Sequence, residues 1–202
     1  MKRNCRWLDY LITECERWVV YVNHTRKRQW CAADQAPEPT PKPELHPKKV
    51  MISVWWGVTG VIHWELLPAN TTVTATVYTA QLERLKAKYL ERRPRAREVY
   101  FLHDNARPHV AIATKEKLDE LGWTVLPHPA YSPDLAPTDY HLFLSLSNSL
   151  SNRNFTDETE LKHYLQAFFD SKSPDFYSSG IHKLPLKWQE VIDNNGSYVN
   201  KK

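Results

Sequence analysis

The order of predicted elements indicates an α/β protein, a mixed sheet flanked by helices with an antiparallel part first and crossover strands later. Three observations predict it: runs of β-branched and aromatic residues early in the chain, helical spacing of apolar residues later, and short apolar runs between the predicted helices. The chain has 202 residues, of which 42% are hydrophobic and 25% charged, so a disordered chain is excluded. We expect a single domain over residues 1–202.

The antiparallel part begins with residues 11–22, whose β-branched and aromatic content predicts a central strand. Residues 50–56 form a strongly apolar run, and residues 61–66 return after a turn at residues 57–60, which predicts a β-hairpin. Between these segments, five prolines fall within residues 37–47. Proline has no backbone N–H and fixes φ, so this insertion is expected to be an extended, exposed arm.

Helices and short strands alternate in the rest of the chain. A helix is expected over residues 73–91, because Tyr78, Leu82, Leu85 and Tyr89 recur at steps of 4, 3 and 4. Further elements are predicted from apolar runs, helical spacing and helix-end residues: a strand at 99–102, a helix at 108–121 that stops at Gly122, a strand at 123–126, a helix that opens at 138–140, and an amphipathic helix after Asp157.

Two carboxylates stand where chemistry is expected. Asp104 follows the predicted strand at 99–102, and Asp139 lies in the first turn of a helix after a proline-rich loop. The ends of strands in open α/β sheets line the ligand crevice, and paired carboxylates suit hard cations such as Mg²⁺. Asp104 as a turn former and Asp139 as a helix-dipole partner remain open from spacing alone.

The sequence around these two residues resembles a known family. Residues 102–109 read Leu-His-Asp-Asn-Ala-Arg-Pro-His, and residues 128–143 read His-Pro-Ala-Tyr-Ser-Pro-Asp-Leu-Ala-Pro-Thr-Asp-Tyr-His-Leu-Phe. Both are similar to the signature blocks of mariner-type transposases in the Tc1/mariner superfamily, and the 34 residues between Asp104 and Asp139 match the family's D,D34D spacing. The run Gly180-Ile181-His182-Lys183-Leu184-Pro185 and the closing Asn195-Gly196-Ser197-Tyr198 also resemble that family.

The resemblance implies an RNase H-like catalytic domain in which three acidic residues hold two Mg²⁺ (or Mn²⁺) ions for cleavage and transfer of DNA strands. It places Asp104 and Asp139 at the second and third acids, which are also the implied metal ligands. It further implies that the proline-rich insertion, about residues 32–48, is a clamp loop reaching across a homodimer. A nuclear location follows from the same resemblance, and no membrane association is expected.

The first acid of the family is missing. The family's strand reads T-G-D-E-K-W, whereas this chain reads Thr13-Glu14-Cys15-Glu16-Arg17-Trp18, so Cys15 stands at the first catalytic position. A thiol is a soft and mostly neutral group at pH 7, whereas Mg²⁺ binds anionic oxygen. Glu14 and Glu16 are adjacent, but successive strand residues point to opposite faces, so neither replaces the aspartate without a local bulge. We therefore expect impaired cleavage.

Basic residues provide the expected contacts to DNA. These are Arg26, Lys27, Arg28, Lys48, Lys49 and Arg107, together with His109, which can alternatively orient Asp104. The family's N-terminal helix-turn-helix region has no counterpart in this sequence, so binding is expected to be largely non-specific and salt-dependent. Two other functions stay open: an active Mg²⁺-dependent endonuclease or transposase in which Glu14 or Glu16 substitutes, and a non-catalytic dimerisation or protein-interaction module.

Overall fold

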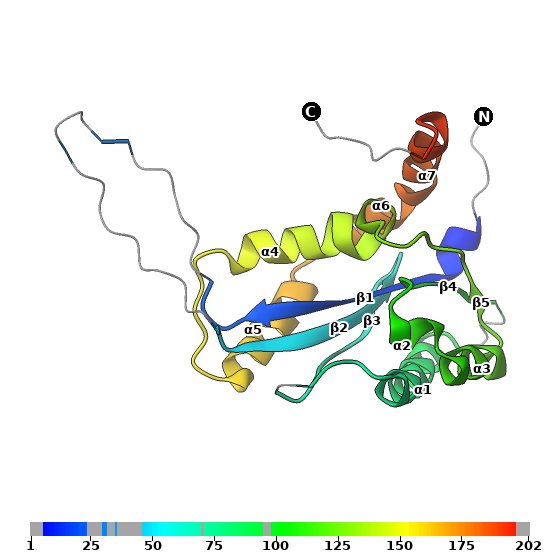
Figure 1. The fold of residues 1–202 in the computed structure, drawn as a ribbon, viewed down its shortest axis with the longest axis horizontal. Helices are drawn as coiled ribbons and strands as arrows, with labels where there is room; N and C mark the ends of the chain where they lie inside the picture. Colours follow the sequence, from blue (N-terminus) through cyan, green and yellow to red (C-terminus); the bar gives the residue numbers. More distant parts are fainter. Residues whose placement is uncertain are drawn as a thin grey trace.

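The structure, a computed structural model, describes residues 6–23, 30, 31, 35, 46–69, 71–94 and 98–196. Its centre is a five-stranded mixed sheet in the order β3-β2-β1-β4-β5 (Figure 1). Strand β1 (Leu11–Val20) pairs antiparallel with β2 (Lys49–Gly57), and β2 pairs antiparallel with β3 (Gly60–Leu66). Strands β4 (Tyr100–Leu102) and β5 (Thr124–Val125) continue the sheet parallel to β1. The predicted order of an antiparallel part followed by crossover strands is therefore confirmed.

Helices connect and cover these strands. The α-helices are α1 (Ala75–Arg92), α2 (Arg107–Val110), α3 (Ile112–Leu121), α4 (Leu144–Leu150), α5 (Glu158–Asp170), α6 (Pro174–His182) and α7 (Leu184–Asp193). Three short helical turns are η1 (Arg6–Tyr10), η2 (Pro133–Leu135) and the π-helical η3 (Thr138–Phe143), which runs directly into α4. No helix in the described part of the chain has both the length and the apolarity that crossing a bilayer requires.

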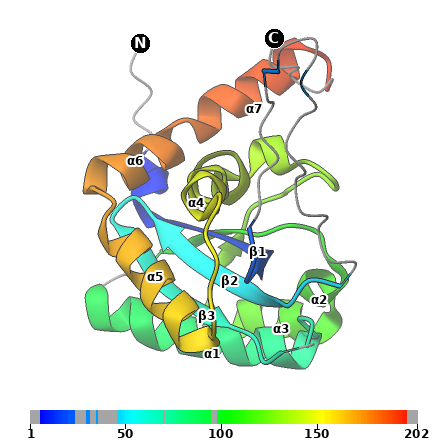
Figure 2. The same cartoon turned by 90° about the vertical axis from the view of Figure 1, so that its left-hand side faces the viewer.

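The two faces of the sheet are covered by different helices (Figure 2). Helices α1 and α3 pack on one face, where Ile12 and Trp55 meet the buried α1 residues Leu82 and Leu85. Helices α4, α5 and α6 cover the other face around Trp56. Residues of β1 alternate between these two cores, so adjacent side chains of β1 belong to different surroundings. The division decides which residues can meet at the site.

Local sequence signals explain the element ends. The side chain of Thr74 accepts a hydrogen bond from the backbone N–H of Val77 at the start of α1, and Asp157 does the same for Glu160 at the start of α5. Helix α3 ends at Gly122, which has φ +70° and so occupies the left-handed region that glycine favours. The predicted hairpin and the predicted buried face of α1 are confirmed.

Several predicted boundaries were wrong. The helix expected over 108–121 is broken at Ala111, whose ψ of 148° is extended, and the Thr114 hydroxyl donates to the Pro108 carbonyl at 2.6 Å across the break. The strand expected at 123–126 is reduced to Thr124–Val125, because only these two residues pair with β4. Helices α6 and α7 were not predicted. The proline-rich arm lies almost wholly outside the described residues.

Candidate active site

The face of β1 toward α4 carries the residue at the first acid position. The Cys15 thiol donates to Oδ2 of Asp139, with an S···O distance of 3.6 Å, and also to the backbone carbonyl of Glu16. Burial, and then the negative charge of Asp139, raises the pKa of the Cys15 thiol well above its usual value. Burial also raises the pKa of Asp139. Sulfur therefore stands next to the third acid as a neutral hydrogen-bond donor.

The π-helical turn η3 holds Asp139 over the sheet. Trp56 on β2 donates its indole N–H to the Thr138 hydroxyl at 3.0 Å, and Thr13 on β1 lies 3.4 Å from the same oxygen. Thr138 is fully buried, so these contacts satisfy polar groups that have no access to water. Arg17 adds a bond from Nη1 to the Phe143 carbonyl at 3.1 Å. Hydrogen bonds to Thr138, before Asp139 in the sequence, and to Phe143, after it, therefore hold the turn that carries Asp139.

Asp104 follows β4 and is held by two donors. Its Oδ1 accepts from the backbone N–H of Ala106 at 2.8 Å and contacts Nδ1 of His109 at 2.6 Å. Burial alone raises the pKa of Asp104, but these two hydrogen bonds outweigh it, and the net shift is downward. Asp104 is therefore an ionised carboxylate. Its charge raises the pKa values of both Cys15 and Asp139, so Cys15, Asp104 and Asp139 share one electrostatic site.

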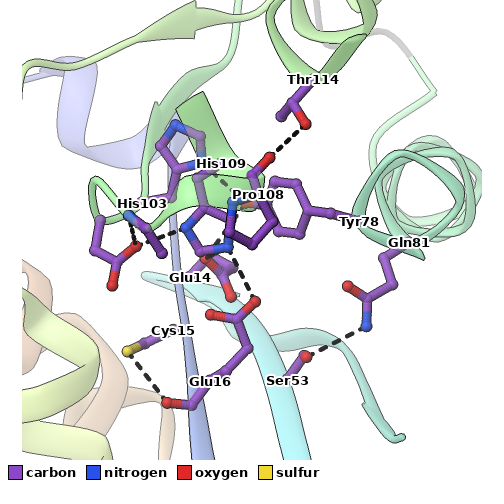
Figure 3. A network of polar contacts seen from close by, with 12 residues as sticks. Glu14, Cys15, Glu16, Ser53, Tyr78, Gln81, His103, Pro108, His109 and Thr114 are labelled. Carbon is purple, nitrogen blue, oxygen red and sulfur yellow. Dashed lines mark hydrogen bonds and ion pairs between the residues drawn. The ribbon is translucent and has the colours of Figure 1, made fainter. Parts of the chain in front are cut away.

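His109 connects Asp104 to the opposite face of β1, and Figure 3 shows its ring beside Glu14 and Glu16. Its Nε2 lies 3.0 Å from Oε1 of Glu16 and 4.0 Å from Oε2 of Glu14. Burial lowers the pKa of His109, but the carboxylates of Glu14, Asp104 and Glu16 outweigh burial and raise it to about 11. The ring is therefore a buried imidazolium at neutral pH, and it bridges Glu16 to Asp104.

Glu14 lies deeper on the same face. Its side chain is fully buried, and burial followed by the charge of Glu16 raises its pKa well above the usual range. Tyr78 on α1 donates to Oε2 of Glu14 at 3.3 Å and lies 2.9 Å from Nδ1 of His103. Burial, and then the positive charge of His109, lowers the pKa of His103 to about 3, so this imidazole is neutral.

The structure thus places Asp139 in contact with Cys15 and Asp104 in contact with His109, and it holds the two glutamates on the other face, against His109. The expected DNA contact of His109 does not fit this position, because the residue is 1% exposed and both ring nitrogens contact carboxylates. The alternative expectation, that His109 orients Asp104, fits the 2.6 Å contact. The buried group of Glu14, Tyr78 and His103 was not predicted; the i, i+2 spacing of Glu14 and Glu16 was the available signal.

The side chains of Cys15, Asp104 and Asp139 decide whether a pair of divalent ions fits on the face of β1 toward α4. Asp104 and Asp139 offer the anionic oxygens that Mg²⁺ or Mn²⁺ binds, but the third position offers a protonated thiol that already donates to Asp139. Two carboxylates suit one ion. On this face of β1 the described side chains offer two acids, Asp104 and Asp139, and one thiol, that of Cys15.

Some of the expected DNA-contacting residues are exposed. Lys48, Lys49 and Arg107 are all accessible to solvent. The ammonium groups of the two lysines lie over aromatic rings, Lys48 4.3 Å from the centroid of Tyr21 and Lys49 4.5 Å from that of Trp18. Arg26, Lys27 and Arg28 lie outside the described residues.

Comparison with known proteins shows to which family a chain with this arrangement belongs. A family model described as Transposase (partial DDE domain) matches residues 20–99. The chain is 40% identical to the Mariner Mos1 transposase of Drosophila mauritiana, covering 96% of this chain and 57% of that protein. The crystal structure of the catalytic domain of Mos1 mariner transposase matches with a TM-score of 0.81 at 39% identity, covering 96% of this chain and 85% of that one. The chain belongs to the mariner transposase family.

Two further matches agree with this membership and with an RNase H-like α/β fold. The chain is 44% identical to "Histone-lysine N-methyltransferase SETMAR" of Homo sapiens over 96% of its own length, but it covers 29% of that protein. The Mos1 transposase paired-end complex with left transposon end matches with a TM-score of 0.92 at 42% identity, covering 96% of this chain and 57% of that one. The chain thus spans less than two thirds of these longer relatives.

Proposed function

We propose that this chain is a mariner transposase-derived nucleic-acid-binding domain whose ancestral reaction, DNA strand cleavage and transfer, is impaired. The observation that carries the proposal is the contact between the Cys15 thiol and Asp139. In this contact a neutral donor occupies the place where the family carries a metal-binding carboxylate. Losing one anchor of a metal site costs several kcal/mol of transition-state stabilisation, which corresponds to a rate loss on the order of 10³-fold.

A single divalent ion, Mg²⁺ or Mn²⁺, is the proposed cofactor, held by Asp104 and Asp139. Structures of the Mos1 paired-end complex with Mn and with Mg support the choice of ion by similarity. When bound, such an ion polarises a phosphoryl oxygen and lowers the pKa of coordinated water. In this chain the hydrogen bonds from Ala106 and His109 fix the orientation of Asp104, and Thr138 fixes the turn that carries Asp139.

DNA is the proposed partner, bound largely without sequence preference. The exposed cations Lys48, Lys49 and Arg107, with Arg26, Lys27 and Arg28, supply phosphate contacts. The transposon-end DNA named in the Mos1 paired-end complex supports this class of ligand. Such binding weakens steeply as salt rises, because each phosphate contact releases counterions. A partner of this kind also supports a nuclear location.

Nicking of supercoiled plasmid tests the proposal. Unaltered protein in Mg²⁺ or Mn²⁺ is expected to nick slowly or not at all, and Cys15→Asp is expected to nick faster. The double variant with Asp104→Asn and Cys15→Asp is the matched control. It removes an acid that metal-dependent cleavage requires whether the unaltered chain is impaired or active. Rapid nicking by the unaltered chain refutes impairment, and no gain in a folded Cys15→Asp variant refutes its cause.

An active endonuclease in which Glu14 or Glu16 supplies the missing acid is the second candidate. The link from Glu16 through His109 to Asp104 favours it, whereas the direct contact of Asp139 with sulfur disfavours it. Any cleavage measured in the unaltered chain should fall in Glu14→Gln or Glu16→Gln if this candidate holds. Unchanged cleavage in both variants excludes it.

A dimerisation or protein-interaction role is the third candidate, with the clamp loop at residues 32–48 as the docking element. The five prolines within residues 37–47 support it, because an extended segment presents backbone and side chains to a partner at low entropic cost. Light scattering on the full chain and on a variant that lacks residues 33–47 tests it. A dimer that becomes monomeric on deletion supports this role, and the same mass in both excludes it.

A further inference from the structure

The second face of β1 carries a group of ligating side chains that the proposed DNA chemistry does not use. Glu14, His103 and His109 each offer one ligand atom, and these atoms lie within 4.8 Å of one another. They come from three separate elements, β1, the segment after β4, and α2. All three residues are buried, with exposed fractions of 2%, 7% and 1%. The fold therefore converges two imidazoles and a carboxylate in its interior (Figure 3).

One atom in this group has no partner. Oε1 of Glu14 is buried and accepts no hydrogen bond, although Oε2 of the same carboxyl accepts one from Tyr78. A buried carboxylate oxygen without a partner costs free energy, and such atoms are rare in folded proteins. The other groups near this carboxyl are Nε2 of His109, 4.0 Å from Oε2, and the carboxyl of Glu16, whose charge and hydrogen bond help to raise the pKa of Glu14 above its burial-raised value. The group thus has a buried oxygen with unused coordinating capacity.

The surrounding contacts resemble those around protein-bound transition metals. A metal-binding histidine usually donates its second ring N–H to a carboxylate or another acceptor, which fixes the ring. Nδ1 of His109 contacts Oδ1 of Asp104 at 2.6 Å, which leaves Nε2 facing Glu14 and Glu16. The Tyr78 hydroxyl contacts both His103 and Glu14. All three side chains are therefore already oriented by outer contacts from other elements.

We propose that Glu14, His103 and His109 form a binding site for a borderline transition-metal ion of the Zn²⁺ type, separate from the Asp104 and Asp139 pair. Two imidazoles and one carboxylate are a donor set that Zn²⁺ accepts and Mg²⁺ does not prefer. Ligand atoms of a tetrahedral zinc site lie about 3.4 Å apart, as bonds of about 2.0–2.1 Å require. Binding therefore draws the three side chains inward by about one ångström, and Zn²⁺ replaces the proton on Nε2 of His109.

A cavity adjoins the two histidines of the site. This cavity of about 420 Å³ is lined by His103 and His109, with His128, Asn105 and Lys115 among its other walls. A water molecule or an exogenous ligand entering there can complete the coordination of the ion, as in zinc sites with three protein ligands.

Metal binding to chelator-stripped full-length protein tests the proposal. Calorimetric titration with Zn²⁺ is expected to give one strong site per chain, with Mg²⁺ failing to compete at equal concentration. Glu14→Gln and His103→Gln should each weaken Zn²⁺ binding at least tenfold. Because replacing a buried residue can unfold the chain, circular dichroism accompanies each variant, and Co²⁺ titration of the unaltered protein tests the ligands without substitution. A Co²⁺ complex with visible d–d absorption and no sulfur-to-cobalt charge-transfer band is expected.

Two matched variants separate this site from other sources of binding. His163→Gln replaces an exposed histidine of α5 and should leave Zn²⁺ affinity unchanged. Cys15→Ser removes the sulfur on the other face of β1 and should also leave it unchanged. Absence of Zn²⁺ binding, undiminished binding in folded Glu14→Gln and His103→Gln, loss of binding in Cys15→Ser, or a strong sulfur band with Co²⁺ each overturns the proposal.

Discussion

Replacing His109 with glutamine is the sharpest test of the electrostatic network at the site. In the metal-free chain the imidazolium contacts Asp104 at 2.6 Å and Glu16 at 3.0 Å, and it lies 4.0 Å from Glu14. His109→Gln keeps a hydrogen-bonding side chain of similar length but removes the positive charge. Three carboxyl groups then face one another without a cation. We expect a large loss of stability, because the low dielectric of the protein interior screens the repulsion between these charges poorly.

The size of the loss follows from the burial of the partners. Removing one member of a buried ion pair costs about 3–5 kcal/mol. The Asp104 side chain is 47% exposed and is partly solvated, and Glu14 can remain protonated, so both reduce the cost. The low end, about 3 kcal/mol, is therefore expected. For a chain of this size it corresponds to a fall in Tm of about 10 °C.

Urea unfolding at pH 7, followed by tryptophan fluorescence, measures this loss. The control is Lys88→Gln, which breaks the exposed Lys88–Glu91 pair of α1 and should cost less than about 0.5 kcal/mol. In a double-mutant cycle, adding Glu16→Gln to His109→Gln should recover part of the loss, because it removes one uncompensated carboxylate. A cost for His109→Gln as small as that of Lys88→Gln refutes the network.

Three further outcomes are expected. The pKa of His109 is raised to about 11 in the folded chain, so the contribution of this residue to stability is complete below about pH 6.5 and is lost as pH rises toward 11. The free energy of unfolding should fall by up to about 1.4 kcal/mol per pH unit in this range. Urea unfolding at pH 7, 8 and 9 should show the decline, and His109→Gln should lessen it. Thr138→Val leaves the buried Trp56 indole N–H without its acceptor and should cost about 1–3 kcal/mol in thermal unfolding, with a changed near-UV tryptophan signal; an unchanged Tm would show that Trp56 finds another acceptor. Gly57→Ala places a Cβ 2.6 Å from the Leu11 carbonyl oxygen and should lower the free energy of unfolding by about 1–3 kcal/mol. In Gly122→Ala the added Cβ meets no atom within 4 Å, and the cost should be about 1 kcal/mol through the positive φ alone. Equal Tm values for the two variants would contradict the clash at Gly57.

The parts of the fold that could be predicted have local causes. The steps of 4, 3 and 4 between Tyr78 and Tyr89 identify the buried face of α1, and the turn at residues 57–60 identifies the hairpin. The break at Ala111 has a different origin. There the Thr114 side chain satisfies the carbonyl of Pro108, a bond that competes with the helix and leaves no trace in apolar spacing.

The site was predictable only in part, for a similar reason. The family signature places Asp104 and Asp139, and strand alternation separates Cys15 from the two glutamates. Neither reveals that Tyr78 of α1 packs against His109, with ring centroids 4.2 Å apart, or that this packing encloses Glu14. Burial of Glu14 depends on residues 64 and 95 positions away in the sequence, and such contacts follow from tertiary packing alone.

The residues at positions 14 and 15, which both differ from those of the family, act together on the charge of β1. Where the family carries glycine and aspartate, this chain carries Glu14 and Cys15, so one carboxyl group is kept but moves to the opposite face of the strand. The face toward Asp139 becomes neutral at that position, and the face toward α1 gains a buried acid beside His109. The imidazolium then lies between two acids of β1 and Asp104. Loss of the first acid and the gain of the buried ligand group therefore have one structural basis, the exchange of side-chain charge between neighbouring positions of a single strand.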